Sequence, residues 1–212
     1  MTIVKTCGKL YWAGEYAILE PGQLALIKAI PIYMTAEIES SEVYRLYSDM
    51  FSYSVDLRPD SSYALIQETV ALVEEFLTAQ GVDLRPFSID IRGKMEREGK
   101  KFGLGSSGSV VVLVIKAMLA FYERPVERDL LFKLASAVLL KRGDNGSMGD
   151  IACIVSEDLA LYQSFDREKV AEWLEKEDLP TVLARDWGFS IRSIKPTLKF
   201  DFLVGWTKEV AV

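Results

Sequence analysis

The sequence predicts an α+β domain in which an antiparallel or mixed sheet packs against helices. Up to about residue 57, β-branched and aromatic residues alternate with polar ones, a pattern typical of antiparallel strands. Later segments carry longer apolar runs with helical spacing, separated by loops that contain glycine. With 212 residues, half of them hydrophobic, the chain is long enough to bury a sizeable core.

The N-terminal part is expected to be mostly sheet. Residues 3–10 form an apolar strand candidate that is interrupted at Gly8, and a turn is expected at residues 20–22. Short alternating segments predict four further strands, at residues 24–40, 43–48, 53–57 and 87–91.

Four segments predict helices. Residues 65–77 place apolar side chains on one face, with Ser61 and Ser62 as N-cap candidates and Gly81 at the end. The apolar run at residues 110–121 is too long for a buried strand, so a buried helix is expected there. The last elements expected are helices at residues 129–142 and 166–176 and strands at residues 187–194 and 198–206.

A loop rich in glycine and serine, at residues 103–109, leads directly into the expected buried helix. Its glycines allow the backbone to approach a ligand closely, and its serines are N-cap candidates. The unpaired N–H groups and the positive end of a helix dipole favour an anion. The loop therefore predicts a phosphate site, with Lys100 and Lys101 adding positive charge; a glycine-serine turn before a core helix is the alternative.

Three better-known glycine patterns fit this loop less well. Gly103, Gly105 and Gly108 have the spacing of the dinucleotide fingerprint, but the residues before them are a charged run rather than a strand. Glu123 lies at the distance of the fingerprint's acidic residue, yet it ends an expected helix. The Walker sequence Gly-Lys-Ser/Thr is absent, and the hydrolase pattern Gly-x-Ser-x-Gly does not fit the register.

Composition excludes several classes of function. The net charge of -6 argues against a nucleic-acid or anionic-membrane partner. No apolar run approaches the roughly 20 residues that span a bilayer, and the N-terminus lacks a signal-peptide layout, so a soluble cytoplasmic protein is expected. Cys7 and Cys153 have no closely spaced partner, which favours buried free thiols. Because histidine is absent, any chemistry must use Lys, Asp, Glu, Ser, backbone dipoles or a hard cation.

Charged residues beside other glycines are further site candidates. Lys9 stands among small and apolar residues, as a lysine that reaches into a site would, although a surface lysine is the commoner case. Asp150 ends a glycine-rich loop as either an N-cap or an active-site carboxylate, and its spacing favours the cap. Lys141 and Arg142 precede this loop, where they form either part of an anion site or a solvated face.

Three separated segments resemble the family of galactokinase, homoserine kinase, mevalonate kinase and phosphomevalonate kinase. They read Gly-Lys-Leu-Tyr-Trp-Ala-Gly-Glu-Tyr at residues 8–16, Gly-Leu-Gly-Ser-Ser-Gly at 103–108 and Gly-Ser-Met-Gly-Asp at 146–150. The wording is most similar to the bacterial branch that acts on 5-phosphomevalonate. The resemblance implies the fold of the second domain of a small-subunit ribosomal protein, and transfer of the ATP γ-phosphoryl group to that acceptor. A mevalonate or homoserine kinase and an inert nucleotide-binding module are the alternatives.

The same resemblance implies roles for individual residues. Lys9 and Asp150 would be catalytic, and Ser107 would also face Mg²⁺. The acceptor would be met by Tyr16, Lys101, Arg142 and Ser147. The ATP phosphates would be held by the whole glycine loop, namely Gly103, Leu104, Gly105, Ser106, Ser107, Gly108 and Ser109.

The chain also departs from the family. The family often has proline where Cys7 stands and alanine where Gly108 and Ser109 stand. Its third glycine-rich motif and ferredoxin-like C-terminal domain have no counterpart here. Residues 1–196 would form the ATP-binding kinase domain and residues 197–212 the first strand of the missing domain, so a fragment with little or no turnover is expected. The sequence leaves the oligomeric state open.

Overall fold

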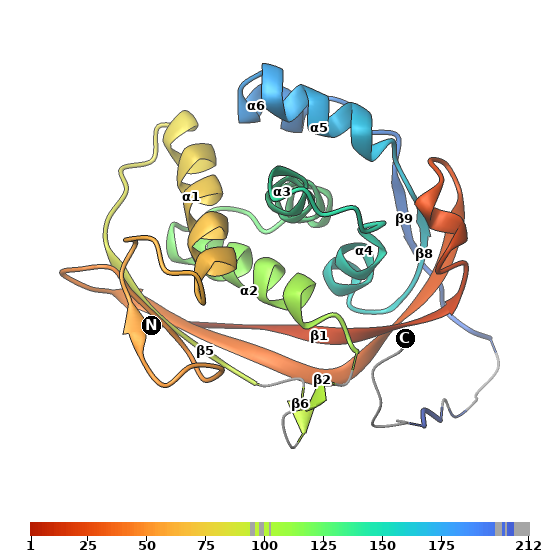
Figure 1. Ribbon diagram of the computed structural model, residues 1–212, viewed down its shortest axis with the longest axis horizontal. Helices are drawn as coiled ribbons and strands as arrows, with labels where there is room; N and C mark the ends of the chain where they lie inside the picture. The colour runs from red at the N-terminus through yellow and green to blue at the C-terminus, as the bar shows by residue number, and fades with distance from the viewer. Residues whose placement is uncertain (94–95, 98–99, 102, 198–200, 202, 206–212) are drawn as a thin grey trace.

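The computed structural model describes residues 1–93, 96–97, 100–101, 103–197, 201 and 203–205, with backbone alone at residues 96–97 and 100–101. A curved sheet of seven strands supports the helices on one of its faces (Figure 1). The strand order is β4-β3-β5-β2-β8-β9, and β1 pairs with the other edge of β2. The predicted α+β class, with a mixed sheet packed against helices, is confirmed.

The sheet is built on the long antiparallel pair of β1 (Thr2–Ala13) and β2 (Leu24–Ser40). The predicted strand at residues 3–10 is therefore longer, and Gly8 marks a register shift rather than an end. Cys7 pairs with Tyr33 and Gly8 with Ile30, so Pro31 and its neighbour bulge out of the ladder. Pro31 has no N–H to donate, and on its other side it lies between the parts of β2 that pair with β8 and β5.

The remaining strands are short, and one of them makes the sheet mixed. β3 runs parallel to β5, whereas the other pairs are antiparallel. The strand predicted at 53–57 shortens to two residues, the one at 187–194 to four, and β8 was not predicted. The predicted strand at 198–206 lies mostly outside the described residues. The bounds are Arg45–Ser48 for β3, Ser54–Val55 for β4, Phe87–Arg92 for β5, Leu159–Gln163 for β8 and Ser190–Ser193 for β9.

Helices α1 to α4 lie over one face of the sheet, while α5 and α6 lie farther out, against α3 and α1 (Figure 1). All four predicted helices are confirmed, as α1, α2, α3 and α5, and α4, α6 and the short η1 are additional. The bounds are Ala17–Leu19 for η1, Ala64–Ala79 for α1, Ser106–Phe121 for α2, Arg128–Lys141 for α3, Gly149–Ser156 for α4, Arg167–Lys176 for α5 and Leu179–Ala184 for α6.

A small antiparallel ribbon precedes the glycine loop. It pairs β6 (Glu96–Arg97) with β7 (Lys100–Lys101), where the sequence predicted a charged run without a strand. This ribbon is separate from the main sheet. The loop therefore still lacks the parallel strand that a dinucleotide fingerprint requires.

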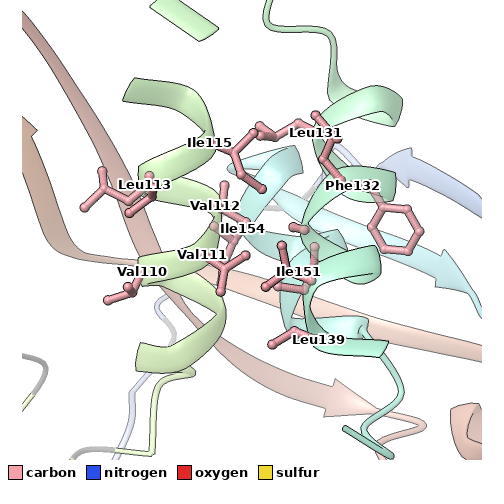
Figure 2. Packing of buried hydrophobic residues seen from close by; sticks show 14 of the residues in the cluster. Val110, Val111, Val112, Leu113, Ile115, Leu131, Phe132, Leu139, Ile151 and Ile154 are labelled. Atoms are coloured by element: carbon pink, nitrogen blue, oxygen red, sulfur yellow. The ribbon is translucent and has the colours of Figure 1, made fainter. Parts of the chain in front are cut away.

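Helix α2 is the centre of the core. From Val110 to Phe121 it is apolar except for Lys116, which is typical of a helix covered on most sides. Side chains of α2, α3 and α4 meet in one apolar layer (Figure 2). The fully buried residues of α2 include Val111, Val112, Leu113, Val114 and Ile115.

The start of α1 differs from the prediction, and its end agrees with it. The predicted caps Ser61 and Ser62 stand before the helix, and Tyr63 occupies the N-cap position. Asp60 Oδ1 instead accepts hydrogen bonds from the backbone N–H groups of Ser62 at 2.9 Å and Tyr63 at 3.2 Å. Gly81 does end the helix, in a left-handed conformation with φ of 71°.

The burial of α2 predicts a large loss of stability when one of its core side chains is shortened. Leu113→Ala should lower the free energy of unfolding by about 2–5 kcal/mol, because Leu113 is fully buried. Urea unfolding should show a lower midpoint at an unchanged slope. The control Leu84→Ala, at a side chain 37% exposed, should cost much less. Equal losses in the two variants would show that α2 is not the core element.

Candidate active site

The glycine loop is fastened to β1 by three hydrogen bonds. The backbone N–H of Lys9 donates to the carbonyl of Leu104 at 3.0 Å. Thr6 Oγ1 donates to the carbonyl of Ser109 at 3.1 Å, and Ser109 Oγ donates to the carbonyl of Cys7 at 2.9 Å. The strand and the start of α2 are therefore held together as one unit. The hydroxyl of Ser109, predicted to bind ATP, is buried and faces the strand.

The N-terminus of α2 begins at this loop. The N-cap residue is Gly105, with a left-handed φ of 79°, and not one of the serines predicted for that position. Ser107 is exposed in the first turn, and Ser106 is partly exposed. The first N–H groups of a helix have no intrahelical partner, and they lie at the positive end of the dipole. This end of α2 is therefore suited to an anion.

Because Gly105 and Gly108 have no side chain, Lys9 and Asp150 can lie close to the start of α2. A Cβ atom at Gly105 would lie 2.9 Å from Lys9 Cε and 3.5 Å from Asp150 Cβ. A Cβ atom at Gly108 would lie 2.7 Å from Asp150 Oδ2. An alanine at position 108 would thus displace this carboxylate. The three elements β1, α2 and α4 meet here.

Asp150 lies in the first turn of α4, so the N-cap role that the sequence favoured for it is wrong. The N-cap residue is Met148, which has a left-handed φ of 59°. Asp150 Oδ1 accepts a hydrogen bond from the N–H of Ile151 at 2.9 Å. Burial raises the pKa of the Asp150 carboxyl, and the positive charge of Lys9 partly offsets this rise.

Lys9 and Asp150 do not form a direct ion pair. The Lys9 ammonium instead lies over the ring of Tyr11, with Nζ 4.9 Å from the ring centre. An ammonium over an aromatic face is attracted by the ring quadrupole. Lys9 therefore has a defined resting position beside the glycine loop.

Ser147 is held from several sides just before α4. Its Oγ lies 3.3 Å from Tyr11 Oη and accepts a hydrogen bond from the N–H of Gly149 at 3.3 Å. Its carbonyl accepts a hydrogen bond from Tyr162 Oη at 3.0 Å. Tyr11 and Tyr162 were not predicted as site residues. The alternation of a strand could have indicated Tyr11, because it places residues 9 and 11 on one face.

The other predicted site residues do not join this cluster. Tyr16 is 81% exposed at the start of η1. Arg142 pairs with Glu68 on α1, with Nη1 and Oε2 2.6 Å apart. The backbone of Lys101 belongs to β7, but its side chain lies outside the described residues.

Two hollows in the surface lie away from the cluster. One, of about 520 Å³, is lined by residues 49–53. The other, of about 280 Å³, lies between α1 and α3, where Arg142 is one of the lining residues. Neither is lined by Lys9, Asp150 or the glycine loop. The candidate site is identified by the side chains that converge at the start of α2.

The described residues contain no group of three or more His, Cys, Asp or Glu side chains that could hold a metal ion. A magnesium ion typically takes one or two protein oxygens and completes its shell with phosphate and water. The exposed hydroxyl of Ser107 and the carboxylate of Asp150 are oxygens of this kind near the loop. In the described part of the chain, no helix has both the length and the apolar character needed to cross a membrane.

Comparison with known proteins finds several that are similar to this chain. Residues 64–158 match the family described as GHMP kinases N terminal domain. A phosphomevalonate kinase from Streptomyces sp. (strain CL190) is 28% identical over 234 residues, which cover 99% of this chain and 63% of that protein.

Solved structures show the same similarity. Streptococcus pneumoniae phosphomevalonate kinase, in complex with phosphomevalonate and AMPPNP, is 75% identical and superposes with a TM-score of 0.98 over all of this chain. The Lin0012 protein from Listeria innocua is 32% identical, with a TM-score of 0.87 over 92% of this chain. The chain spans 64% of the first of these proteins and 57% of the second.

The environment of Asp150 predicts a pH-dependent effect on stability. Burial raises its pKa above the usual 3.8, so the native state binds this proton more tightly than the unfolded chain does. The resulting stabilisation is complete below pH 3.8 and is lost as the pH rises through the native pKa. Asp150→Asn carries no charge, so it should match the parent at pH 3 and exceed it in melting temperature at pH 7.

Thermal unfolding between pH 3 and pH 8 checks this expectation. The control Asp83→Asn, at an exposed carboxylate, should show no comparable gain, since that side chain keeps its water on folding. An Asp150→Asn variant that is less stable than the parent at neutral pH would show that attraction to Lys9 outweighs the cost of burial.

Proposed function

Because the chain has the fold of the GHMP kinase N-terminal domain and resembles the N-terminal part of bacterial phosphomevalonate kinases, we propose that it is the ATP-binding part of such an enzyme. The reaction transfers the γ-phosphoryl group of ATP to (R)-5-phosphomevalonate and gives 5-diphosphomevalonate and ADP. The supporting observation is the convergence of Lys9, the α2 N-terminus and Asp150. The Streptococcus pneumoniae relative, in complex with phosphomevalonate and AMPPNP, supports both substrates.

The phosphates of ATP bind at the N-terminus of α2 in this proposal. The residues 103–109 offer backbone N–H groups and the positive end of a helix dipole, and Gly105 leaves room for close approach. Ser107 would provide an oxygen for Mg²⁺ carried with the nucleotide. A bound Mg²⁺ would offset the negative charge of the phosphates.

Lys9 stabilises the phosphoryl group as it is transferred. Phosphoryl transfer depends mainly on positioning and on neutralising the charge of the equatorial oxygens. The side chain of Lys9 is close to Gly105, the N-cap of the helix proposed to hold the phosphates. It therefore approaches the donor from the β1 side.

Asp150 and Ser147 act on the acceptor side. A phosphate monoester has a second pKa of about 6, so it is mostly a dianion at neutral pH and needs no general base. We therefore assign Asp150 to orientation, either of Lys9 through its charge or of the acceptor's hydroxyl group. Ser147, with Lys101, would meet the anionic end of the acceptor.

A hydroxyl acceptor, as in a mevalonate or homoserine kinase, is the second candidate. The raised pKa of Asp150 is the observation that favours it, because a carboxylate with a higher pKa is a better general base. Phosphorylation assays with 5-phosphomevalonate, mevalonate and homoserine separate the candidates.

Turnover is proposed to need a second domain. The chain spans 64% of the Streptococcus pneumoniae kinase, and we propose that residues 197–212 enter the first strand of a ferredoxin-like C-terminal domain. This chain alone should bind nucleotide weakly and turn over poorly. Mixing it with the separately produced C-terminal part of that relative should restore ATP consumption in the presence of the acceptor.

The binding role of the loop predicts the effect of Gly105→Ala. The added Cβ would stand 2.9 Å from Lys9 Cε in a left-handed backbone, so calorimetry with Mg-AMPPNP should show at least about tenfold weaker binding. Gly81→Ala is the matched control, since it carries similar backbone strain with no atom within 4 Å and lies at the end of α1. Equal affinities in the two variants would contradict the assignment.

The role of Lys9 predicts a loss of rate rather than of affinity. In the restored two-part enzyme, Lys9→Met should lower turnover by about 100- to 1000-fold, the typical cost of losing one transition-state donor. Nucleotide affinity should change far less. Lys141→Met, which breaks a surface ion pair with Glu75, is the control and should leave the rate unchanged. A fall in affinity alone would make Lys9 a binding residue only.

A further inference from the structure

Tyr11 contacts both Lys9 and Ser147, two residues proposed to act on opposite substrates. Residues 9 and 11 lie on the same face of β1 because side chains alternate along a strand. The Lys9 ammonium lies over the ring, with Nζ 4.9 Å from its centre, and Tyr11 Oη lies 3.3 Å from Ser147 Oγ. One side chain thus connects the lysine to the loop before α4.

The hydrogen bonds around Ser147 determine what its hydroxyl group can offer a ligand. Its Oγ already accepts from the N–H of Gly149, and a serine oxygen has two lone pairs. If Tyr11 donates to the second lone pair, the hydroxyl proton of Ser147 is left to donate elsewhere. Burial raises the pKa of Tyr11 to about 12, so Tyr11 keeps the proton that it would donate at neutral pH.

We propose that Tyr11 is a positioning residue: its ring holds the Lys9 ammonium beside the glycine loop, and its hydroxyl fixes Ser147 as a hydrogen-bond donor to the acceptor's phosphate. Phosphate oxygens only accept hydrogen bonds when ionised, so a serine fixed as a donor suits this acceptor. The identity of the acceptor rests on the proposed function, whereas the contact between the Tyr11 ring and the Lys9 ammonium does not.

The close approach of α4 to β1 supports a fixed position for Tyr11. A Cβ atom at Gly149 would lie 2.5 Å from Tyr11 Oη and 2.8 Å from Ile18 Cδ1. No side chain fits between the tyrosine and the start of α4, so the hydroxyl stays within reach of Ser147. Tyr162, which donates to the Ser147 carbonyl, holds the serine backbone from the other side.

The first test needs no ligand and no activity. Protons held over the face of an aromatic ring are shifted upfield by the ring current, so the ε-methylene NMR signal of Lys9 should lie upfield of those of exposed lysines. Comparison with Lys9→Met assigns this signal. Tyr11→Phe should keep the shift and Tyr11→Leu should abolish it. An unshifted Lys9 signal in the parent, or a shift that survives Tyr11→Leu, would overturn the ring contact.

The second test measures binding of 5-phosphomevalonate by calorimetry. Tyr11→Phe should weaken this binding about three- to tenfold, the effect of one hydrogen bond, and leave Mg-AMPPNP affinity within about twofold. In a Ser147→Ala background, Tyr11→Phe should have no further effect, because the two hydroxyls act as a pair. The control Tyr44→Phe removes a tyrosine hydroxyl that bonds Glu74 away from the site, and it should leave both affinities unchanged.

These outcomes separate the positioning of Ser147 from the contact between the Tyr11 ring and the Lys9 ammonium. Additive losses from Tyr11→Phe and Ser147→Ala, or equal losses for both ligands, would overturn the positioning of Ser147 and indicate a merely structural tyrosine. A parent that binds Mg-AMPPNP but not 5-phosphomevalonate would overturn the acceptor side together with the proposed function. The NMR signal of Lys9 would still decide the contact between ring and ammonium.

Discussion

The hydrogen bonds between β1 and the glycine loop are the constraint on which the rest of the site depends. They join Lys9 to Leu104, Thr6 to Ser109 and Ser109 to Cys7. Since the loop is fixed to β1, the position and direction of the first turn of α2 are fixed as well. The rest of α2 must therefore run through the core. This explains why α2 is mostly apolar, and its side chains pack against those of α3 and α4 (Figure 2).

The start of α4, which carries Met148 and Asp150, is held in a less favourable conformation. Met148 is 1% exposed and adopts a left-handed backbone, which is costly for a residue with a side chain. Asp150 is placed where burial disfavours its charge. Both costs are offset by the surrounding core, where α4 packs against β1, β2 and α2. A conformation maintained against its local preference, next to a fixed helix N-terminus, is typical of a functional site.

The sequence predicts well where a pattern is long and poorly where tertiary contacts decide. Helix α2 was predictable because its apolar run is too long for a strand, whereas the five residues of β8 resemble any short apolar segment. Serine is a common N-cap residue, so the serines of the loop were predicted to cap α2. The N-cap is Gly105 instead, because a side chain at this position would collide with Lys9. Tyr11 could not be predicted as a site residue, because only the folded chain brings it near Ser147. Arg142 was predicted to bind the acceptor, but it forms an ion pair with Glu68 instead.

In the proposed function, donor and acceptor bind at two adjacent helix starts, those of α2 and α4. Titration of the ¹⁵N-labelled chain, followed by amide chemical shifts, tests it most directly. Mg-AMPPNP should first shift the amides of residues 105–109, and 5-phosphomevalonate added afterwards should shift those of residues 146–150. If both ligands change the chemical shifts of the same amides, or if the changes lie around the hollow at residues 49–53, separate donor and acceptor sites at α2 and α4 are contradicted.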